Sequence, residues 1–348
     1  MPPLYKHIAS INLPVREALK KLDQLASDAI LFLVDDENKL KGSLTDGDLR
    51  RGFIKGLNFD DHLLSFIQPN PKYIQQGKYN LTEIIALREK NFSVFPVVND
   101  LMQIVNVVNF KHQKSYLPVD ALIMAGGRGE RLRPLTDSAP KPLLMVGEKP
   151  IIEHNIDRLS KYGIDDIWIS VRYLGEQLVD YLKDGSKKAI RINYLWEKDA
   201  LGTAGALGLV NDFIHEHVLM MNSDLLTNID FEEMFLFMER EQADFVVACV
   251  PYTVNIPYAV MQVENKQVTG FKEKPTYTHY SNAGIYLMKR EVVEFVKKNQ
   301  PYDATDLMED LIKAKKKVVA FPLIGYWLDI GKHEDYKKAQ MDINSIKF

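Results

Sequence analysis

From Val119 onward the chain alternates short apolar runs with amphipathic helical stretches, and this alternation limits the fold more than any other feature. The runs VDALIMA, DIWISV, IRINYLW, HVLMMNSD and ADFVVACV have the length and composition of strands. Helical periodicity follows in PIIEHNIDRLSKYG, GEQLVDYLKDG and DFEEMFLFMERE. Strands that alternate with helices predict an α/β domain with a Rossmann-like, mixed and mostly parallel sheet that carries helices on both faces.

The first 110 residues have a different plan and suggest a weak internal duplication. Two segments, SDAILFLVDDENKLKGSLTDGDLRRGF and, about sixty residues later, KNFSVFPVVNDLMQIVNVVNF, both read as strand, turn and strand. A helical pattern precedes each of them. The polar stretch KHQKSYLP then separates this smaller α+β part from the βα alternation. We therefore expect two domains, over residues 1–115 and 116–348.

Composition excludes several classes of protein. The 348 residues suit about two domains, and a net charge of −3 argues against a nucleic-acid partner. No apolar run approaches the ~20 residues that a membrane span needs, and the amino terminus lacks the apolar core of a secretory signal. The single cysteine, Cys249, lies in an apolar run and cannot form a disulfide framework. We expect a cytoplasmic, reduced protein with Cys249, Trp168 and Trp196 in its core.

A glycine-rich loop, AGGRGERLRPLTDSAPKPLLMV, follows the first predicted strand of the larger domain. Gly126, Gly127 and Gly129 lack Cβ atoms, so backbone N–H groups can approach a phosphate closely. Arg131 and Lys141 add cations, and prolines on both sides of Lys141 restrict its backbone. The pattern does not satisfy the GxGxxG rule for dinucleotides. For the glycines alone, a surface turn with solvated cations is an equal alternative.

The same loop resembles the signature of sugar-1-phosphate nucleotidyltransferases, a GGxGxRLxPLT run followed by PKPL. The resemblance continues in order through WEKDALGTAGAL, MNSD, FKEKP, NAGIYLM and YWLDIG, over about 230 residues. It implies a GT-A-like nucleotidyltransferase fold and an enzyme of class EC 2.7.7. Such an enzyme joins a sugar 1-phosphate to a nucleoside triphosphate and releases pyrophosphate, chiefly by positioning and charge neutralisation.

The resemblance also implies roles for residues that lie far apart in the chain. Each residue alone has a structural alternative, such as a helix cap for an aspartate, a turn for an Asn or Gly, or a solvated pair for adjacent charges. The implied set comprises the nucleotide-binding residues Ala125, Gly126, Gly127, Gly129, Glu197, Gly202 and Thr203, the catalytic residues Arg131, Lys141 and Lys274, the sugar-binding residues Glu273, Asn282 and Gly284, and the Mg²⁺ ligands Asp224 and Asp329.

Glu197 bears on the choice of base. A carboxylate only accepts hydrogen bonds, and guanine offers two adjacent donors on its pairing edge, whereas a pyrimidine such as uracil offers one. Glu197 therefore favours GTP, with a contact to ribose or to solvent as the alternative.

The run GSLTDGDLRRG in the first part resembles a cystathionine-β-synthase (CBS) domain, and the duplication resembles a CBS pair. This resemblance implies that Thr45 and Asp48 bind a regulatory nucleotide. The second copy lacks the Thr-x-x-Asp pair, so at most one such site is expected. The alternative is a structural module for dimerisation, and a homo-oligomer is expected in either case.

The order of the two domains resembles guanylyltransferases that make GDP-glucosamine for legionaminic acid, a nonulosonic acid. This resemblance implies GTP and glucosamine 1-phosphate as substrates. Three alternatives remain: another sugar 1-phosphate (mannose, glucose or a heptose), a uridylyltransferase, and a nucleotide sensor without activity.

Overall fold

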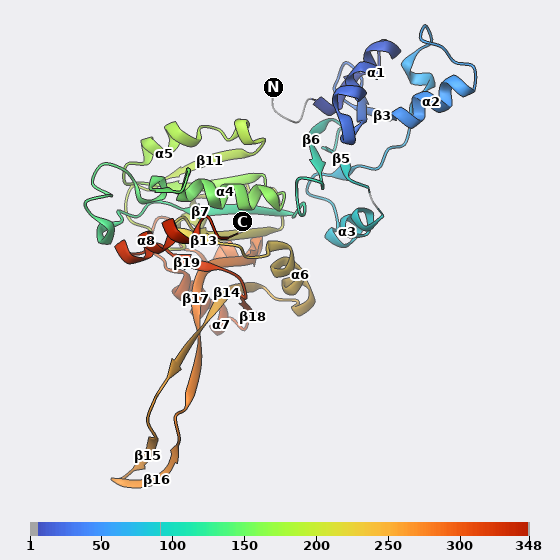
Figure 1. Ribbon diagram of the computed structural model, residues 1–348. Helices are drawn as coiled ribbons and strands as arrows, with labels where there is room; N and C mark the ends of the chain where they lie inside the picture. The colour runs from blue at the N-terminus through green and yellow to red at the C-terminus, as the bar shows by residue number, and fades with distance from the viewer. Residues whose placement is uncertain (1–5, 91, 347–348) are drawn as a thin grey trace.

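The computed structural model describes residues 6–90 and 92–346 (Figure 1). The first five residues, part of the stretch in which no secretory signal was expected, lie outside the described residues. The larger domain is built on a seven-stranded sheet. Its strands lie in the order β11 (Arg191–Trp196), β10 (Asp166–Val171), β7 (Val119–Met124), β12 (His217–Asn222), β17 (Thr276–Lys289), β14 (Phe245–Asn255) and β18 (Val318–Pro322).

The strand directions confirm a mixed, mostly parallel sheet. Strands β11, β10, β7 and β12 are parallel neighbours, and β14 is parallel to β18. Only β17 runs antiparallel, between β12 and β14. The carboxyl ends of β7, β10 and β12 therefore meet at one edge, where the glycine-rich loop begins.

Helices cover both faces of the sheet, as the alternation predicted. Helices α4 (Ile151–Lys161), α5 (Gly175–Leu182) and α6 (Phe231–Glu241) pack on one face with Ile123 and its equivalents on the other strands. Helix α7 (Ala304–Lys313) and the 3₁₀ segment Gly205–Leu209 pack on the other face with Leu122. Neighbouring residues of a strand point to opposite faces, so a strand with two apolar faces is buried by both layers.

Cys249, Trp168 and Trp196 were all expected in the core, and the structure confirms this for some of them but not for all. Cys249 is buried, and Trp168 packs against the second face. Trp196 was expected in the core, but it is 50% exposed. It ends β11, the edge strand of the sheet, and its ring lies over Gly175 at the start of α5, where no further layer covers it.

Short elements surround the beginning of α4. Strand β13 (Leu225–Thr227) pairs with β19 (Trp327–Asp329), and β8 (Met145–Val146) pairs with β9 (Lys149–Pro150). Helix α8 (His333–Asp342) packs against them through a separate apolar cluster that includes Leu132 of the glycine-rich loop. This cluster holds the loop against the carboxyl end of the sheet.

The amino-terminal unit repeats one pattern of strand pairing. The first copy contains β1 (Ile8–Ser10), α1 (Val15–Gln24), β2 (Ile30–Val34), β3 (Leu40–Thr45) and α2 (Asp46–Ile54). The second contains β4 (Ile74–Gln75), α3 (Leu81–Glu89), β5 (Val94–Val98) and β6 (Ile104–Asn109). In both copies the first strand is parallel to the second and the second is antiparallel to the third. The structure thus shows the duplicated plan that the sequence suggested.

Polar contacts join this unit to the carboxyl end of α4 and to the start of α6. Arg88 forms two hydrogen bonds to the Glu232 carboxylate, at 2.9 and 3.0 Å. Asn106 Nδ2 donates to Asp165 Oδ2 at 2.6 Å, and the Lys114 N–H donates to the Lys161 carbonyl at 2.6 Å. The contacts lie near the amino ends of the parallel strands, at the edge of the sheet opposite the glycine-rich loop.

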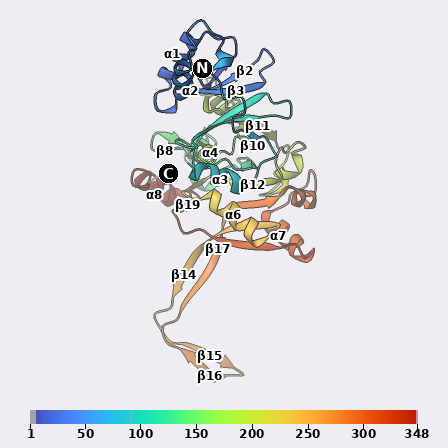
Figure 2. The same ribbon diagram turned by 90° about the vertical axis from the view of Figure 1, so that its right-hand side faces the viewer.

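A two-stranded arm leaves the sheet on the side of β14 and β17. Beyond Cys249, β14 pairs only with β17, and the strands β15 (Val260–Glu264) and β16 (Gln267–Lys272) form the distal hairpin. Figures 1 and 2 show this arm projecting away from the body in both views. Among residues 6–90 and 92–346, no helix has the length and apolarity that a membrane crossing requires.

Candidate functional site

A cavity of about 490 Å³ opens at the carboxyl ends of β7 and β12. Open α/β sheets bind ligands at this edge because loops from several strands converge there. Most of the residues that the sequence assigned to the nucleotide, the phosphates and the metal line this cavity: Ala125, Gly126, Gly127, Gly129, Arg131, Lys141, Glu197, Gly202, Thr203 and Asp224.

The loop after β7 leaves little room for side chains at two glycines. Gly129 has a φ of 62°, in the left-handed region that favours glycine, and the Thr136 hydroxyl donates to its carbonyl at 2.9 Å. A Cβ on Gly126 would lie 3.1 Å from the Glu197 carboxylate. The loop therefore brings backbone to the cavity wall, as close approach to phosphates requires.

Two carboxylates meet beside the loop. Asp224 follows β12 and Asp329 ends β19; pairing of β13 with β19 brings them together, and the Ile330 N–H donates to the Asp224 carbonyl at 3.0 Å. Lys141 forms an ion pair with Asp224 Oδ2. The Oδ1 atoms of Asp224 and Asp329 are buried and have no hydrogen-bond partner. Burial, together with the charge of Asp224, raises the pKa of Asp329.

These orphaned oxygens provide a structural test of the expected magnesium site. A buried carboxylate oxygen without a partner is costly unless a proton or a cation satisfies it. Mg²⁺ prefers carboxylate oxygens and keeps several water or phosphate ligands. Asp224 and Asp329 therefore fit a divalent cation, with Lys141 as the neighbouring positive charge.

Glu197, Gly202 and Thr203 form the opposite wall. The Glu197 carboxylate accepts a hydrogen bond from the Ser170 hydroxyl and another, at 3.3 Å, from the Leu201 N–H. The Thr203 N–H donates to Asp303 at 2.9 Å, which ties this wall to the start of α7. Each carboxylate oxygen has two lone pairs, so Glu197 can still accept from a ligand.

The residues expected to bind the sugar fall in two places. Asn282 and Gly284 lie in β17, next to the end of β12. Gly284 has a φ of 70°, and a Cβ there would lie 2.5 Å from Nδ2 of Asn222, which lines the cavity. Glu273 and Lys274, in contrast, are exposed on the arm, and neither lines the cavity. None of these four residues lines the cavity: Gly284 lies behind its wall, against Asn222, whereas Glu273 and Lys274 lie away from it on the arm.

Sequence reasoning missed several residues of this cavity. Arg172 lines it and donates from Nε to the Gly126 carbonyl at 3.3 Å. Asn222 and Ser223 also line it, and Asn155 of α4 donates to the Ser223 carbonyl at 3.2 Å. A signal was available, because Arg172 and Asn222 stand at the carboxyl ends of two predicted strands.

A second group of potential metal ligands lies at the other edge of the sheet. Oxygen or nitrogen atoms of Asp120, Asp166 and His215 lie within 4.8 Å of one another, and all three residues are buried. Burial raises the pKa of Asp120 to about 7 and lowers that of His215 to about 4. Arg191 already pairs with Asp166. Because Asp120 and Asp166 lie near the amino ends of β7 and β10, this group belongs to no wall of the cavity.

In the amino-terminal unit, Thr45 and Asp48 form a capping box at the start of α2. The Thr45 hydroxyl donates to Asp48 Oδ2 at 2.6 Å, and the Asp48 N–H donates to Thr45 Oγ1 at 3.3 Å. Asp48 Oδ1 pairs with Arg51 at 2.6 Å. Both side chains are thus engaged with each other and with Arg51 in a local helix cap.

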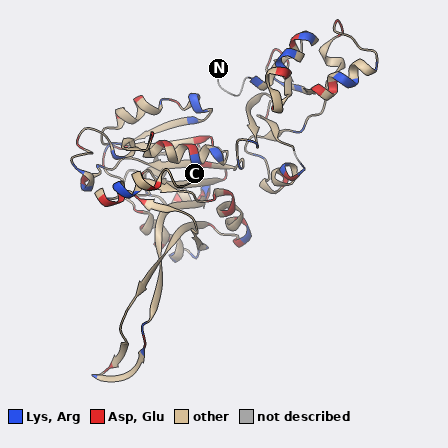
Figure 3. Cartoon of the chain, viewed as in Figure 1, with Lys and Arg blue, Asp and Glu red and all other residues tan. Residues whose placement is uncertain are grey.

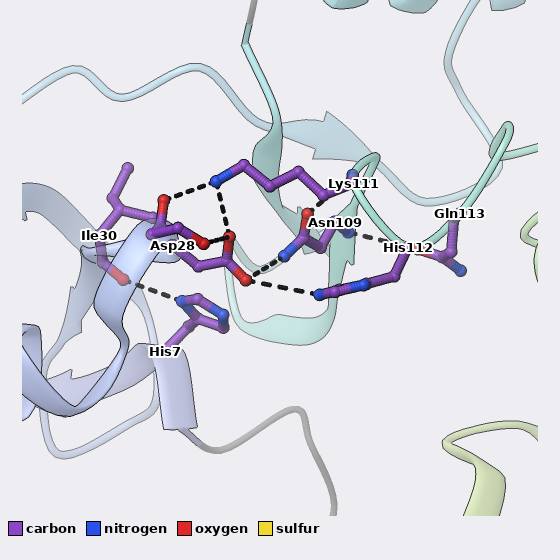
Figure 4. A network of polar contacts seen from close by, with 8 residues as sticks. His7, Asp28, Ile30, Asn109, Lys111, His112 and Gln113 are labelled. Atoms are coloured by element: carbon purple, nitrogen blue, oxygen red, sulfur yellow. Dashed lines mark hydrogen bonds and ion pairs between the residues drawn. The ribbon is translucent and has the colours of Figure 1, made fainter.

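The second copy places other residues at the equivalent positions. Thr45 pairs with Ile30 at the end of its hairpin, and Asn109 pairs with Val94 in the same way. Figure 4 shows Asn109 donating to Asp28 of the first copy, at 2.8 Å. Lys111 pairs with the same carboxylate at 2.8 Å. This position therefore serves to join the two copies.

Comparison with known proteins settles the family of the larger domain. The family model described as "Nucleotidyl transferase" matches residues 120–346, well over half of the chain. The chain belongs to the nucleotidyl transferase family. The model for the CBS domain matches residues 7–55, which correspond to the first copy of the amino-terminal unit.

The relatives of this nucleotidyl transferase differ in base and sugar. "Mannose-1-phosphate guanylyltransferase 1" of Arabidopsis thaliana is 35% identical over 225 residues, 62% of each chain. A "UTP--glucose-1-phosphate uridylyltransferase" of Synechocystis is 30% identical over 240 residues, 63% of this chain and 62% of that one. A solved candidate glucose-1-phosphate thymidylyltransferase from Bacillus anthracis, in complex with a sucrose, has a TM-score of 0.54 and 26% identity over 66% of this chain and 97% of that one. The chain thus spans less than two thirds of the curated relatives' length.

Proposed function

We propose that the larger domain transfers a nucleoside monophosphate from a nucleoside triphosphate to a sugar 1-phosphate and releases pyrophosphate. One observation carries the proposal: the glycine loop, Lys141 and Asp224 line one cavity, and Asp329 lies next to Asp224, so that two carboxylates with unsatisfied buried oxygens stand together there. A nucleotide sensor has no use for a pair of metal-binding carboxylates beside its phosphate loop, so this observation favours an enzyme.

In the proposed reaction, a phosphate oxygen of the sugar 1-phosphate forms a bond to the α-phosphorus of the triphosphate. The bond from that phosphorus to the bridging oxygen breaks, and pyrophosphate leaves with its electron pair. The loop N–H groups and Arg131 bind the phosphates, and Lys141 neutralises charge as it moves toward the leaving group. A cation at Asp224 and Asp329 would supply Lewis-acid polarisation of phosphate oxygens.

GTP and glucosamine 1-phosphate are the proposed substrate pair, with legionaminic acid as the end product of the wider synthesis. Glu197 supports guanine, since it lies on the cavity wall with acceptor capacity remaining. The name of the Arabidopsis relative, a guanylyltransferase, supports guanine as the base. Its name also gives mannose 1-phosphate as the sugar, so mannose 1-phosphate is the main alternative to glucosamine 1-phosphate. The proposal of an amino sugar rests on the resemblance in domain order.

The test is a matrix of five nucleoside triphosphates against glucosamine, mannose, glucose and heptose 1-phosphates, read as pyrophosphate release with magnesium. We expect the highest rate with GTP and glucosamine 1-phosphate. Asp224→Ala should lower turnover by orders of magnitude while the thermal midpoint stays close to that of the wild type. Near-normal turnover in this variant would contradict the metal assignment, and preference for a pyrimidine would contradict the argument from Glu197.

We also propose that residues 1–115 act as a CBS pair that binds a regulatory nucleotide at Thr45 and Asp48. The ligand would have to replace the capping box and the Arg51 contact. Titration calorimetry on the full chain carrying Asp224→Ala, with and without Asp48→Asn, separates this site from the cavity. Nucleotide affinity that is unaffected by Asp48→Asn would leave the unit with a structural role only.

A further inference from the structure

The arm is a continuous extension of the central sheet. Ladder pairing of β14 with β17 runs without a register shift from Cys249 opposite Asn282 to Asn255 opposite Thr276. The six residues from Val250 to Asn255 alone extend the ribbon by ~20 Å at about 3.3 Å per residue. Folding the arm back onto its own domain would break this ladder, so the projection seen in Figures 1 and 2 is set by strand pairing.

The surface of the arm is unsuited to water. The sequence contains no Asp, Glu, Lys or Arg from Phe245 to Val263 or from Pro275 to Met288, and Figure 3 shows the arm next to the body almost without charge. An isolated two-stranded ribbon is marginally stable, and solvent-exposed strand edges ordinarily carry charges that prevent pairing. More than half of the surface remains exposed in Tyr252, Tyr258, Met261, Val263, Phe271 and Tyr280. An uncharged ribbon with these exposed aromatic and apolar side chains is suited to burial against a partner surface.

The arm also carries the residues that the cavity lacks. Glu273 and Lys274 connect β16 to β17, and their carboxylate and ammonium groups are exposed. Among the described residues, the cavity wall includes none between Asp224 and Gly331. The cavity therefore has cations for the triphosphate, in Arg131 and Lys141, but its lining holds no residue of the FKEKP run.

We propose that two copies of the chain exchange arms, so that each arm covers the cavity of the other copy and brings Lys274 and Glu273 to the sugar phosphate. The inference rests on the proposed function, since Lys274 is given a phosphate to bind. A second copy is the partner because each chain has one arm without a cover and one cavity without these residues. A two-fold axis satisfies both at once and closes the assembly as a dimer.

Complementation between two inactive variants tests the exchange. Chains with Lys274→Ala and chains with Asp224→Ala, carrying different affinity tags, are co-expressed and purified in tandem as heterodimers. With exchanged arms, one site of the heterodimer combines an intact cavity with an intact arm and the other combines both defects. The expected turnover is about half that of the wild type. An arm that serves its own chain leaves both sites defective, and an inactive, folded heterodimer would overturn the proposal.

A second measurement keeps oligomeric state separate from catalysis. Sedimentation should show a dimer for the wild type, and Phe271→Glu on the arm should convert it to a monomer with reduced turnover. Ile324→Glu is the matched control, because Ile324 is 93% exposed outside the arm and should leave the dimer intact. A monomeric wild type would overturn the exchange. Wild-type turnover by Lys274→Ala would also overturn it, whereas the transfer reaction itself would still be judged by Asp224→Ala.

Discussion

Gly284 offers a quantitative test of how β17 positions Asn222 on the cavity wall. Its φ of 70° costs an L-residue roughly 1–2 kcal/mol, so Gly284→Ala should destabilise the protein by about that amount. The new Cβ would also lie 2.5 Å from Asn222 Nδ2, about 1 Å closer than an ordinary contact. The Asn222 side chain must move by a similar distance, and a displacement of ~1 Å in a positioned site can cost about 10²-fold in rate.

The assay compares kcat/KM for pyrophosphate release with the thermal midpoint. Gly56→Ala is the matched control, because Gly56 has a φ of 96° but no atom within 4 Å of a new Cβ. Both variants should lose stability through backbone strain, and only Gly284→Ala should lose about 10²-fold in kcat/KM. If Gly284→Ala retains kcat/KM to within about threefold, Asn222 does not position substrate and the argument fails.

Three further predictions concern single polar groups. Glu197→Gln replaces an acceptor-only group, so the ratio of GTP to UTP turnover should fall by about 10–100-fold; an unchanged ratio would mean that Glu197 does not contact the base. The ion pair with Lys111 holds the pKa of Asp28 below its usual range. The stability that this pair contributes is therefore present above about pH 4 and is lost as the pH falls further. In the Asp28→Asn variant, the thermal midpoint should depend less on pH over this acid range. Arg88→Met leaves the partly buried Glu232 carboxylate without its ion-pair partner. Urea denaturation should show that the free energy of unfolding falls by about 1–3 kcal/mol. Identical denaturation curves for the variant and the wild type would contradict a role for this pair at the junction.

The fold of the larger domain could be predicted because its sequence periodicities and its tertiary structure agree. The glycine pair marks the end of β7, and the acid in NSD marks the end of β12, so parallel pairing brings them to one edge. The relation between Asp224 and Asp329 needed the resemblance, since only the pairing of β13 with β19 joins residues so distant in sequence.

Other features depend on long-range pairing that local patterns do not reveal. Asp120, Asp166 and His215 meet only because β7 lies between β10 and β12. Trp196 is apolar, but it ends β11, an edge strand with a neighbouring strand on one side only, and its side chain is exposed. The run FKEKP was expected at the cavity; the ladder from Cys249 to Asn255 instead carries it outward.

Helix α4 is in contact both with the amino-terminal unit and with the loop that carries Asp224. At its carboxyl end, the carbonyls of Ser160 and Lys161 accept hydrogen bonds from Gln113 and from the Lys114 backbone. Within the helix, Asn155 donates to the carbonyl of Ser223, the residue before Asp224. An eleven-residue helix is a stiff rod of ~16 Å. A shift of the amino-terminal unit along this rod would therefore reach the carboxylate pair as a translation of the same helix, without requiring any loop to refold.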